Sequence, residues 1–206
     1  MQPDARADSK TAETDKPEFR AECYRCFRAQ SVCICDRVPN IQNKTGIIVL
    51  QHHREVLHPI GTARIARLSL QNVDVRIAHR VNQLKVNPVV PANTALLYPR
   101  PDARNLDEVD SAEFPEHLIV LDGTWAQAHA MYRANVWLQY LPHLVIRPET
   151  ESNYRIRKQP KQGCLSTIEA LVHTMQLMEP NTERLEDLLS VFNSMVDDQL
   201  RFIDSA

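Results

Sequence analysis

Residues 117–125 read His-Leu-Ile-Val-Leu-Asp-Gly-Thr-Trp, an apolar run that ends at an acidic residue and passes into a helical pattern. A short apolar run bounded by turn residues predicts a buried strand. Ligands of open α/β sheets bind beyond the carboxyl ends of the strands, so we expect the Asp122 carboxylate to face an open cleft. Asp-Gly is also ordinary turn chemistry, and the junction alone does not decide its function.

Strand-like and helix-like patterns alternate on both sides of this junction. The predicted strands span residues 46–50, 73–78, 94–98 and 143–146, and the predicted helices span 62–70, 125–140, 166–178 and 185–203. The last of these helices repeats its leucines close to every 3.6 residues, so we expect its apolar face to pack on the sheet. Residues 99–116 are predicted to form an acidic loop. The alternation predicts an α/β fold with a mostly parallel, doubly wound sheet.

Length and composition favour one domain with small extensions. The chain has 206 residues, of which 43% are hydrophobic, enough for one buried core. Residues 1–18 are polar without an apolar repeat, which predicts a disordered tail. The start of the chain has no signal-peptide pattern and no window has the apolar length of a membrane span, so we expect a cytoplasmic protein.

Charge is distributed unevenly along the chain. Residues 19–104 contain 13 Lys and Arg against 5 Asp and Glu, whereas residues 105–144 contain 1 against 6 and residues 179–206 contain 2 against 7. A polyanion such as RNA would therefore meet the amino-terminal half first. An unevenly charged solvated surface is the alternative explanation.

Four cysteines lie close together in the predicted segment 19–40, as Cys23-x2-Cys26-x6-Cys33-x-Cys35. Four thiolates match tetrahedral zinc and leave no position for water, so we expect a structural Zn²⁺ rather than a catalytic one. Disulfides are disfavoured in a chain without an export signal, while an iron-sulfur cluster remains an alternative. Arginines in this cysteine knob suit contact with an RNA backbone: Arg20, Arg25, Arg28 and Arg37.

Two helix starts carry capping boxes, in which two side chains satisfy free backbone groups. Thr124-x-x-Gln127 opens one helix and Ser166-x-x-Glu169 opens another. Trp125 on the first turn is expected to pack primarily in the core. The second helix follows the basic run Tyr154-Arg-Ile-Arg-Lys-Gln-Pro160, in which Arg155 and Arg157 share one face of an extended segment. Such a run before a helix start predicts an anion pocket.

Taken in order, these motifs closely resemble the DTW-domain family of tRNA-uridine aminocarboxypropyltransferases, named for its Asp-x-Thr-Trp motif. The motif is Asp122-Gly123-Thr124-Trp125 in this chain. The resemblance extends from about Cys23 to Phe202 and includes further blocks: the cysteine knob, His52-His-Arg-Glu55 with Gly61-Thr-Ala-Arg64, Leu96-Leu-Tyr-Pro99, the basic run, and Leu165-Ser-Thr-Ile-Glu-Ala170.

The resemblance implies an enzyme that transfers the 3-amino-3-carboxypropyl group of S-adenosylmethionine to N3 of a tRNA uridine, in the variable loop in bacterial relatives, and releases methylthioadenosine. It also implies a SPOUT-like, knotted fold, with residues 41–206 forming the catalytic domain. Asp122 is the candidate base. The candidate donor-binding residues are Leu97, Leu121, Thr124, Trp125, Ser166, Thr167 and Glu169. The candidate RNA-binding residues are His53, Arg54, Arg155, Arg157 and Lys158.

Two other functions remain compatible with these motifs. One is a SPOUT-like RNA methyltransferase that uses the same donor. The other is a zinc-stabilised RNA-binding module without catalysis. The sequence indicates neither the oligomeric state nor which uridine is modified.

Overall fold

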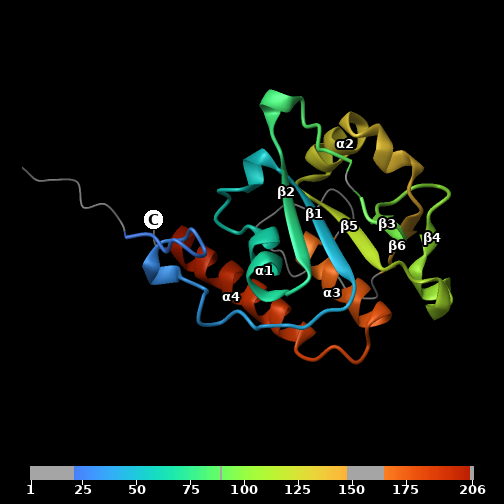
Figure 1. Ribbon diagram of the computed structural model, residues 1–206. Coiled ribbons are helices and arrows are strands. Elements are labelled where there is room, and N and C mark those ends of the chain that lie inside the picture. The colour runs from blue at the N-terminus through green and yellow to red at the C-terminus, as the bar shows by residue number, and fades with distance from the viewer. Residues whose placement is uncertain (1–20, 89, 148–164, 205–206) are drawn as a thin grey trace, which may run out of the picture.

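A computed structural model describes residues 21–88, 90–147 and 165–204 of the chain. Six strands form one sheet in the order β2-β1-β5-β3-β6-β4, and every neighbouring pair is parallel (Figure 1). This sheet confirms the predicted fold class. The strands are β1 Gly46–His52, β2 Val73–Ala78, β3 Thr94–Leu97, β4 Arg104–Asn105, β5 His117–Asp122 and β6 His143–Val145.

Helices cover both faces of the sheet. Successive strand residues point to opposite faces, so each central strand contributes side chains to two cores. Ile47, Val49 and Val120 belong to a large core with helices α1, α3 and α4, whereas Ile48 and Ile119 belong to a smaller core with α2. Burial on both sides explains why the central strands are apolar at nearly every position. The helices are α1 Thr62–Ser69, α2 Trp125–Ala134, α3 Thr167–Met178 and α4 Leu185–Asp204.

Helix α4 was expected to pack on the sheet, but its main contacts are with α1 and α3. Leu188, Phe192 and Met195 are fully buried in the large core. The apolar period of the sequence therefore identified the buried face correctly. It could not show that two other helices lie between that face and the strands.

Two further differences from the prediction arise locally. The helix predicted over 125–140 breaks at Asn135, and a 3₁₀ helix, Val136–Tyr140, follows. The Asn135 side chain donates to the carbonyls of Met131 and Leu84 and accepts from the N–H of Val86, bonds that compete with helix continuation. The predicted loop 99–116 contains the short strand β4, which pairs with β6 at the edge of the sheet.

The cysteine knob, residues 21–40 as described here, lies against α4 near the carboxyl-terminal end of that helix (Figure 1). Its Cys26 and Ile34 are fully buried and join the large core. The Arg37 guanidinium forms an ion pair with Asp198 at 3.1 Å and donates to Ser194. The knob is therefore packed on the main domain rather than held on a free linker.

Two of the predictions fall outside the described residues: the tail 1–18 and the basic run 154–160. The knotted topology also stays a prediction, because the chain between β6 and α3 includes residues 148–164, which are not described. Within the described part of the chain, no helix combines the length and apolarity needed to span a bilayer.

Candidate active site and cysteine centre

Asp122 is anchored at the end of β5 by two side chains. Its Oδ1 accepts a hydrogen bond of 2.7 Å from the Thr62 hydroxyl, and its Oδ2 accepts one of 2.9 Å from the Gln51 amide. The residue is only 3% exposed. The expectation that this carboxylate faces an open cleft is therefore wrong. Hydrogen bonds to an ionised acceptor are strong, so this arrangement holds β1, β5 and α1 together.

The parallel register explains how these groups meet. Gln51 lies opposite Asp122 in the β1–β5 pairing, so both side chains point to the α1 face of the sheet. Thr62 is the first residue of α1, the helix that packs on this face. The sequence offered one signal for Gln51, since it continues the alternation of Ile47 and Val49. It offered no signal for Thr62 beyond its place in a family block.

The capping box predicted after Asp122 is confirmed. The Thr124 hydroxyl accepts from the Gln127 N–H at 3.2 Å, and the Gln127 side-chain oxygen accepts from the Thr124 N–H at 2.6 Å. Gly123 lies beneath this box. A Cβ at Gly123 would be 3.0 Å from both Cβ and Oε1 of Gln127, so a larger residue here would require Gln127 to shift by a few tenths of an ångström.

Trp125 was expected to pack in the core, but it is 43% exposed. The buried face of α2 consists of Ala128, Met131 and Tyr132, which are spaced by three and four residues. Trp125 is not among these buried residues. Trp125 therefore presents an aromatic surface to solvent immediately after the Asp-x-Thr segment. Exposed aromatic rings next to a polar site commonly stack on planar ligands.

The second capping box, at the start of α3, is also confirmed. The Glu169 carboxylate accepts from the Ser166 N–H at 2.7 Å, and the Ser166 hydroxyl accepts from the Glu169 N–H at 3.3 Å. Both residues are buried, whereas Thr167 between them is partly exposed. The carboxylate of Glu169 thus serves the helix start.

The residues expected to bind the donor are divided between the two faces of the sheet. Leu97 packs with the large core, on the face that Asp122 also points to, whereas Leu121 packs with the smaller core beneath α2. Among the described residues, one cavity of about 510 Å³ lies around Glu179 and another of about 240 Å³ lies beside His143. Asp122 lines neither of them.

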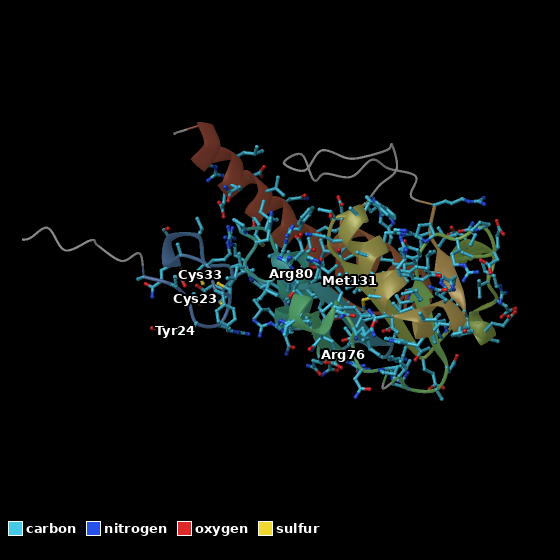
Figure 2. All side chains as sticks on the ribbon, turned by 90° about the horizontal axis from the view of Figure 1, so that it is seen from above. Cys23, Tyr24, Cys33, Arg76, Arg80 and Met131 are labelled. Atoms are coloured by element: carbon cyan, nitrogen blue, oxygen red, sulfur yellow. The ribbon has the colours of Figure 1, made fainter. Side chains whose placement is uncertain are left out.

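Two of the five expected RNA-binding residues are described, and both lie just beyond the carboxyl end of β1. His53 is partly exposed and Arg54 is exposed. Sequence reasoning did not single out Arg80, which is exposed just beyond the adjacent strand β2 and is labelled in Figure 2. The other three lie outside the described residues: Arg155, Arg157 and Lys158.

The arginines of the cysteine knob do not all face solvent. Arg25 is exposed, Arg28 is 7% exposed and Arg37 is paired with Asp198. The expectation that Arg28 contacts an RNA backbone is therefore wrong. Arg20 lies outside the described residues.

The four cysteine sulfurs lie within 4.8 Å of one another, as the clustering in the sequence predicted. Figure 2 labels two of these residues, Cys23 and Cys33. The Sγ atoms of Cys23 and Cys35 are 3.6 Å apart, and those of Cys26 and Cys33 are 3.7 Å apart. These separations are far longer than a disulfide bond, and all four cysteines are free. The set fits a tetrahedral thiolate site.

The environments of the thiols differ. The backbone N–H groups of Cys26 and Arg25 lower the pKa of the Cys23 thiol to about 6. Burial raises the pKa of the Cys35 thiol to about 12. The raised pKa of Cys35 opposes ionisation of this thiol at neutral pH, and a bound cation supplies the positive charge that favours its thiolate form. The donor set and the N–H groups that face it are thus suited to a metal ion.

Comparison with known proteins places these features in a family. The chain matches the model of the DTW domain over residues 20–200. It is 31% identical to tRNA-uridine aminocarboxypropyltransferase 2 of Drosophila melanogaster, across 97% of this chain and 83% of the fly protein. The same identity to the Mus musculus protein of that name covers 89% of this chain but 65% of the relative, slightly under two thirds of its length.

A plant relative agrees with these two. The chain is 29% identical to tRNA-uridine aminocarboxypropyltransferase A of Arabidopsis thaliana, across 96% of this chain and 88% of the relative. No solved structure matches the chain. The family model covers most of the chain, and the Asp-x-Thr-Trp segment occupies the end of a central strand. The chain therefore belongs to the DTW domain family.

Proposed function

We propose that this protein transfers the 3-amino-3-carboxypropyl group of S-adenosylmethionine to N3 of a uridine in tRNA. The match to the DTW domain over residues 20–200 carries the proposal, together with relatives named for this activity. In the reaction, N3 of uracil loses its proton and forms a bond to the γ-carbon of the methionine moiety. The bond from that carbon to sulfur breaks, and methylthioadenosine leaves with the electron pair.

The leaving group is already activated as a sulfonium, so orientation is the main task of the protein. The propyl carbon, rather than the methyl carbon, must face the nucleophile. We propose that Trp125 stacks on a planar ring of the bound reactants, since its side chain is exposed beside the motif. Thr124, Thr167 and the start of α3 are proposed to receive the polar part of the donor.

The base role predicted for Asp122 stays a prediction. Its burial and its two hydrogen bonds favour a positioning role, in which the carboxylate fixes the start of α1 against β1 and β5. The two roles differ in a measurable way. A base would be needed for kcat, whereas a positioning residue would be needed for stability and for the placement of Thr62.

We propose that tRNA binds across the carboxyl ends of β1 and β2. Arg54 and Arg80 supply exposed basic groups there, and His53 is partly exposed beside them, which suits phosphate contact. The basic residues Arg155, Arg157 and Lys158 are proposed to extend this surface. A protein that modifies tRNA is expected in the cytoplasm, and the variable loop is the expected target.

We propose that Cys23, Cys26, Cys33 and Cys35 hold a structural Zn²⁺. Four thiolates leave no coordination position for a substrate, so the ion would supply folding energy and no chemistry. The chain is then organised as a tail (1–18), a zinc segment (19–40) and a catalytic domain (41–206). An iron-sulfur cluster is the alternative, and its visible absorption would reveal it.

Product analysis tests the proposed function. The purified protein is incubated with unmodified tRNA and S-adenosylmethionine, and the nucleosides and the small-molecule products are identified by mass spectrometry. Aminocarboxypropyl-uridine with methylthioadenosine is the expected result. Methylated nucleoside with S-adenosylhomocysteine would instead establish a methyltransferase, and tRNA binding without any modified nucleoside would establish a binding module.

A further inference from the structure

Two arginines are buried at the boundary between the cysteine knob and the main domain. Arg28 belongs to the knob and is 7% exposed. Arg64 lies in the first turn of α1 and is 6% exposed. The Nη1 atom of each is buried without a hydrogen-bond partner in the described part of the chain. Burial lowers the pKa of both guanidinium groups, because it disfavours their charged forms. Arginine stays charged in proteins, so this pair requires a negative partner.

Most of the acidic groups near the two arginines are already engaged. Asp198, near Arg28, is paired with Arg37. Asp122, near Arg64, accepts from Thr62 and Gln51. Cys26, in contrast, is fully buried and packs in one core with Ala63 and Ile65 of α1. The Arg28 carbonyl accepts from the Cys23 N–H at 2.8 Å, and Arg67 of α1 donates to the Arg25 carbonyl at 3.1 Å, so both Arg28 and Arg64 lie on segments that contact the cysteine loop.

The charge of a four-cysteine centre depends on what it binds. Four protonated thiols are neutral and would add no negative charge beside the two unpartnered Nη1 atoms. Four thiolates around a divalent cation form a dianion, which matches the two buried positive charges. Charge compensation around a metal centre commonly comes from groups just outside the ligands.

We propose that Arg28 and Arg64 are the counter-cations of a dianionic four-thiolate metal centre, so that metal binding fixes α1 against the knob. This inference rests on the proposed metal centre at Cys23, Cys26, Cys33 and Cys35. The two arginines are positioning residues and not ligands.

The proposed role of Arg64 also concerns the Asp-x-Thr-Trp motif, because Arg64 and Thr62 lie in the same turn of α1. Arg64 donates from Nη2 to the carbonyls of Val56 and His58, in the connection between β1 and α1. The same turn begins with Thr62, whose hydroxyl binds Asp122. A change of charge at the cysteine centre therefore acts on the helix start that anchors the motif.

Metal competition tests the proposal directly. The full-length protein and its Arg28→Gln, Arg64→Gln and Arg25→Gln variants are titrated with a chromophoric chelator, and Zn²⁺ content is measured by elemental analysis. Arg25 is exposed in the same knob, so Arg25→Gln is the matched control. We expect Zn²⁺ affinity to fall by roughly tenfold or more for Arg28→Gln and Arg64→Gln, and to be unchanged for the control. Equal affinity in all four proteins would overturn the proposal.

A second measurement separates charge compensation from ordinary packing. Arg28→Gln should lower the melting temperature of the metal-loaded protein but raise that of the stripped protein, because an uncompensated buried charge is removed. An equal decrease in both states would refute the proposal. Arg28→Lys, which keeps the charge, should retain more metal affinity than Arg28→Gln.

Cobalt provides a readout that does not depend on stability. In the Co²⁺-substituted protein, Arg28→Gln and Arg64→Gln should shift the sulfur-to-cobalt charge-transfer band, whereas Arg25→Gln should not. A wild-type protein that binds neither Zn²⁺ nor Co²⁺ nor iron would show that the metal centre itself was assigned wrongly. Tight binding with no effect of either arginine would show that only the counter-cation assignment was wrong.

Discussion

Thr62→Val isolates the hydroxyl group that binds Asp122, because valine keeps the shape of threonine. The lost bond is 2.7 Å long and its acceptor residue is 3% exposed, so water cannot replace it freely. Hydrogen bonds to charged groups contribute about 1.5–3 kcal/mol to stability. For a domain of this size, ~1 kcal/mol corresponds to a shift of about 2–4 °C in melting temperature. We therefore expect thermal unfolding to occur about 3–12 °C lower in the variant.

A double-mutant cycle with Asp122→Ala identifies the cause of that loss. In the Asp122→Ala background the Thr62 hydroxyl has no carboxylate acceptor, so Thr62→Val should cost little, and the interaction free energy should reach about 1.5–3 kcal/mol. Thr174→Val is the control. Thr174 is also fully buried, but its hydroxyl donates to the Ala170 carbonyl at 2.8 Å within α3. Its effect should add to that of Asp122→Ala. Additive behaviour of Thr62→Val as well would refute the reasoning that Asp122 is anchored by Thr62.

Three further changes test other parts of the structure. Burial raises the pKa of the Glu179 carboxyl, but hydrogen bonds from Thr45 and Lys44 outweigh it and the net pKa lies below its ordinary value of 4.5. Glu179→Gln should therefore lower the free energy of unfolding at pH 7. This difference from wild type should disappear as the pH falls below about 4.5. A constant difference in the free energy of unfolding in urea across that pH range would contradict the assignment. Gly123→Ala should cost about 1–2 kcal/mol by opening the capping box on α2, measured by denaturation, and unchanged stability would mean that Gln127 can move aside. Trp125→Ala should cost less than about 1 kcal/mol of stability, because the residue is 43% exposed. It should nevertheless raise KM for the donor or for tRNA, and Trp125→Phe should lower that KM again in part. Unaltered kinetics would exclude stacking.

Positions determined by local chemistry were predictable from the sequence. The strand 117–122, the capping boxes of Thr124 and Ser166, and the clustering of the four cysteines depend on neighbouring residues, and the structure has all of them. The sheet class followed from the alternation of elements.

Features that depend on distant residues were not predictable. The burial of Asp122 requires the β1–β5 register and the arrival of Thr62, which no local pattern encodes. Trp125 was assigned to the core because large aromatic residues usually bury their surface, but the phase of α2 places it outside. The position of α4 depends on which helices contact the strands, and α1 and α3 make those contacts.

The contact between Arg37 and Asp198 joins residues that are 161 positions apart in the chain. During synthesis the cysteine segment leaves the ribosome long before the helix that supports it, by about 8–32 s at ~5–20 residues per second. Its thiols spend that interval without their final support on α4, open to oxidation or to capture by the wrong ion. With the proposed metal centre, maturation of this protein therefore depends on cellular conditions that keep new thiols reduced and supply the right ion until α4 has been synthesised.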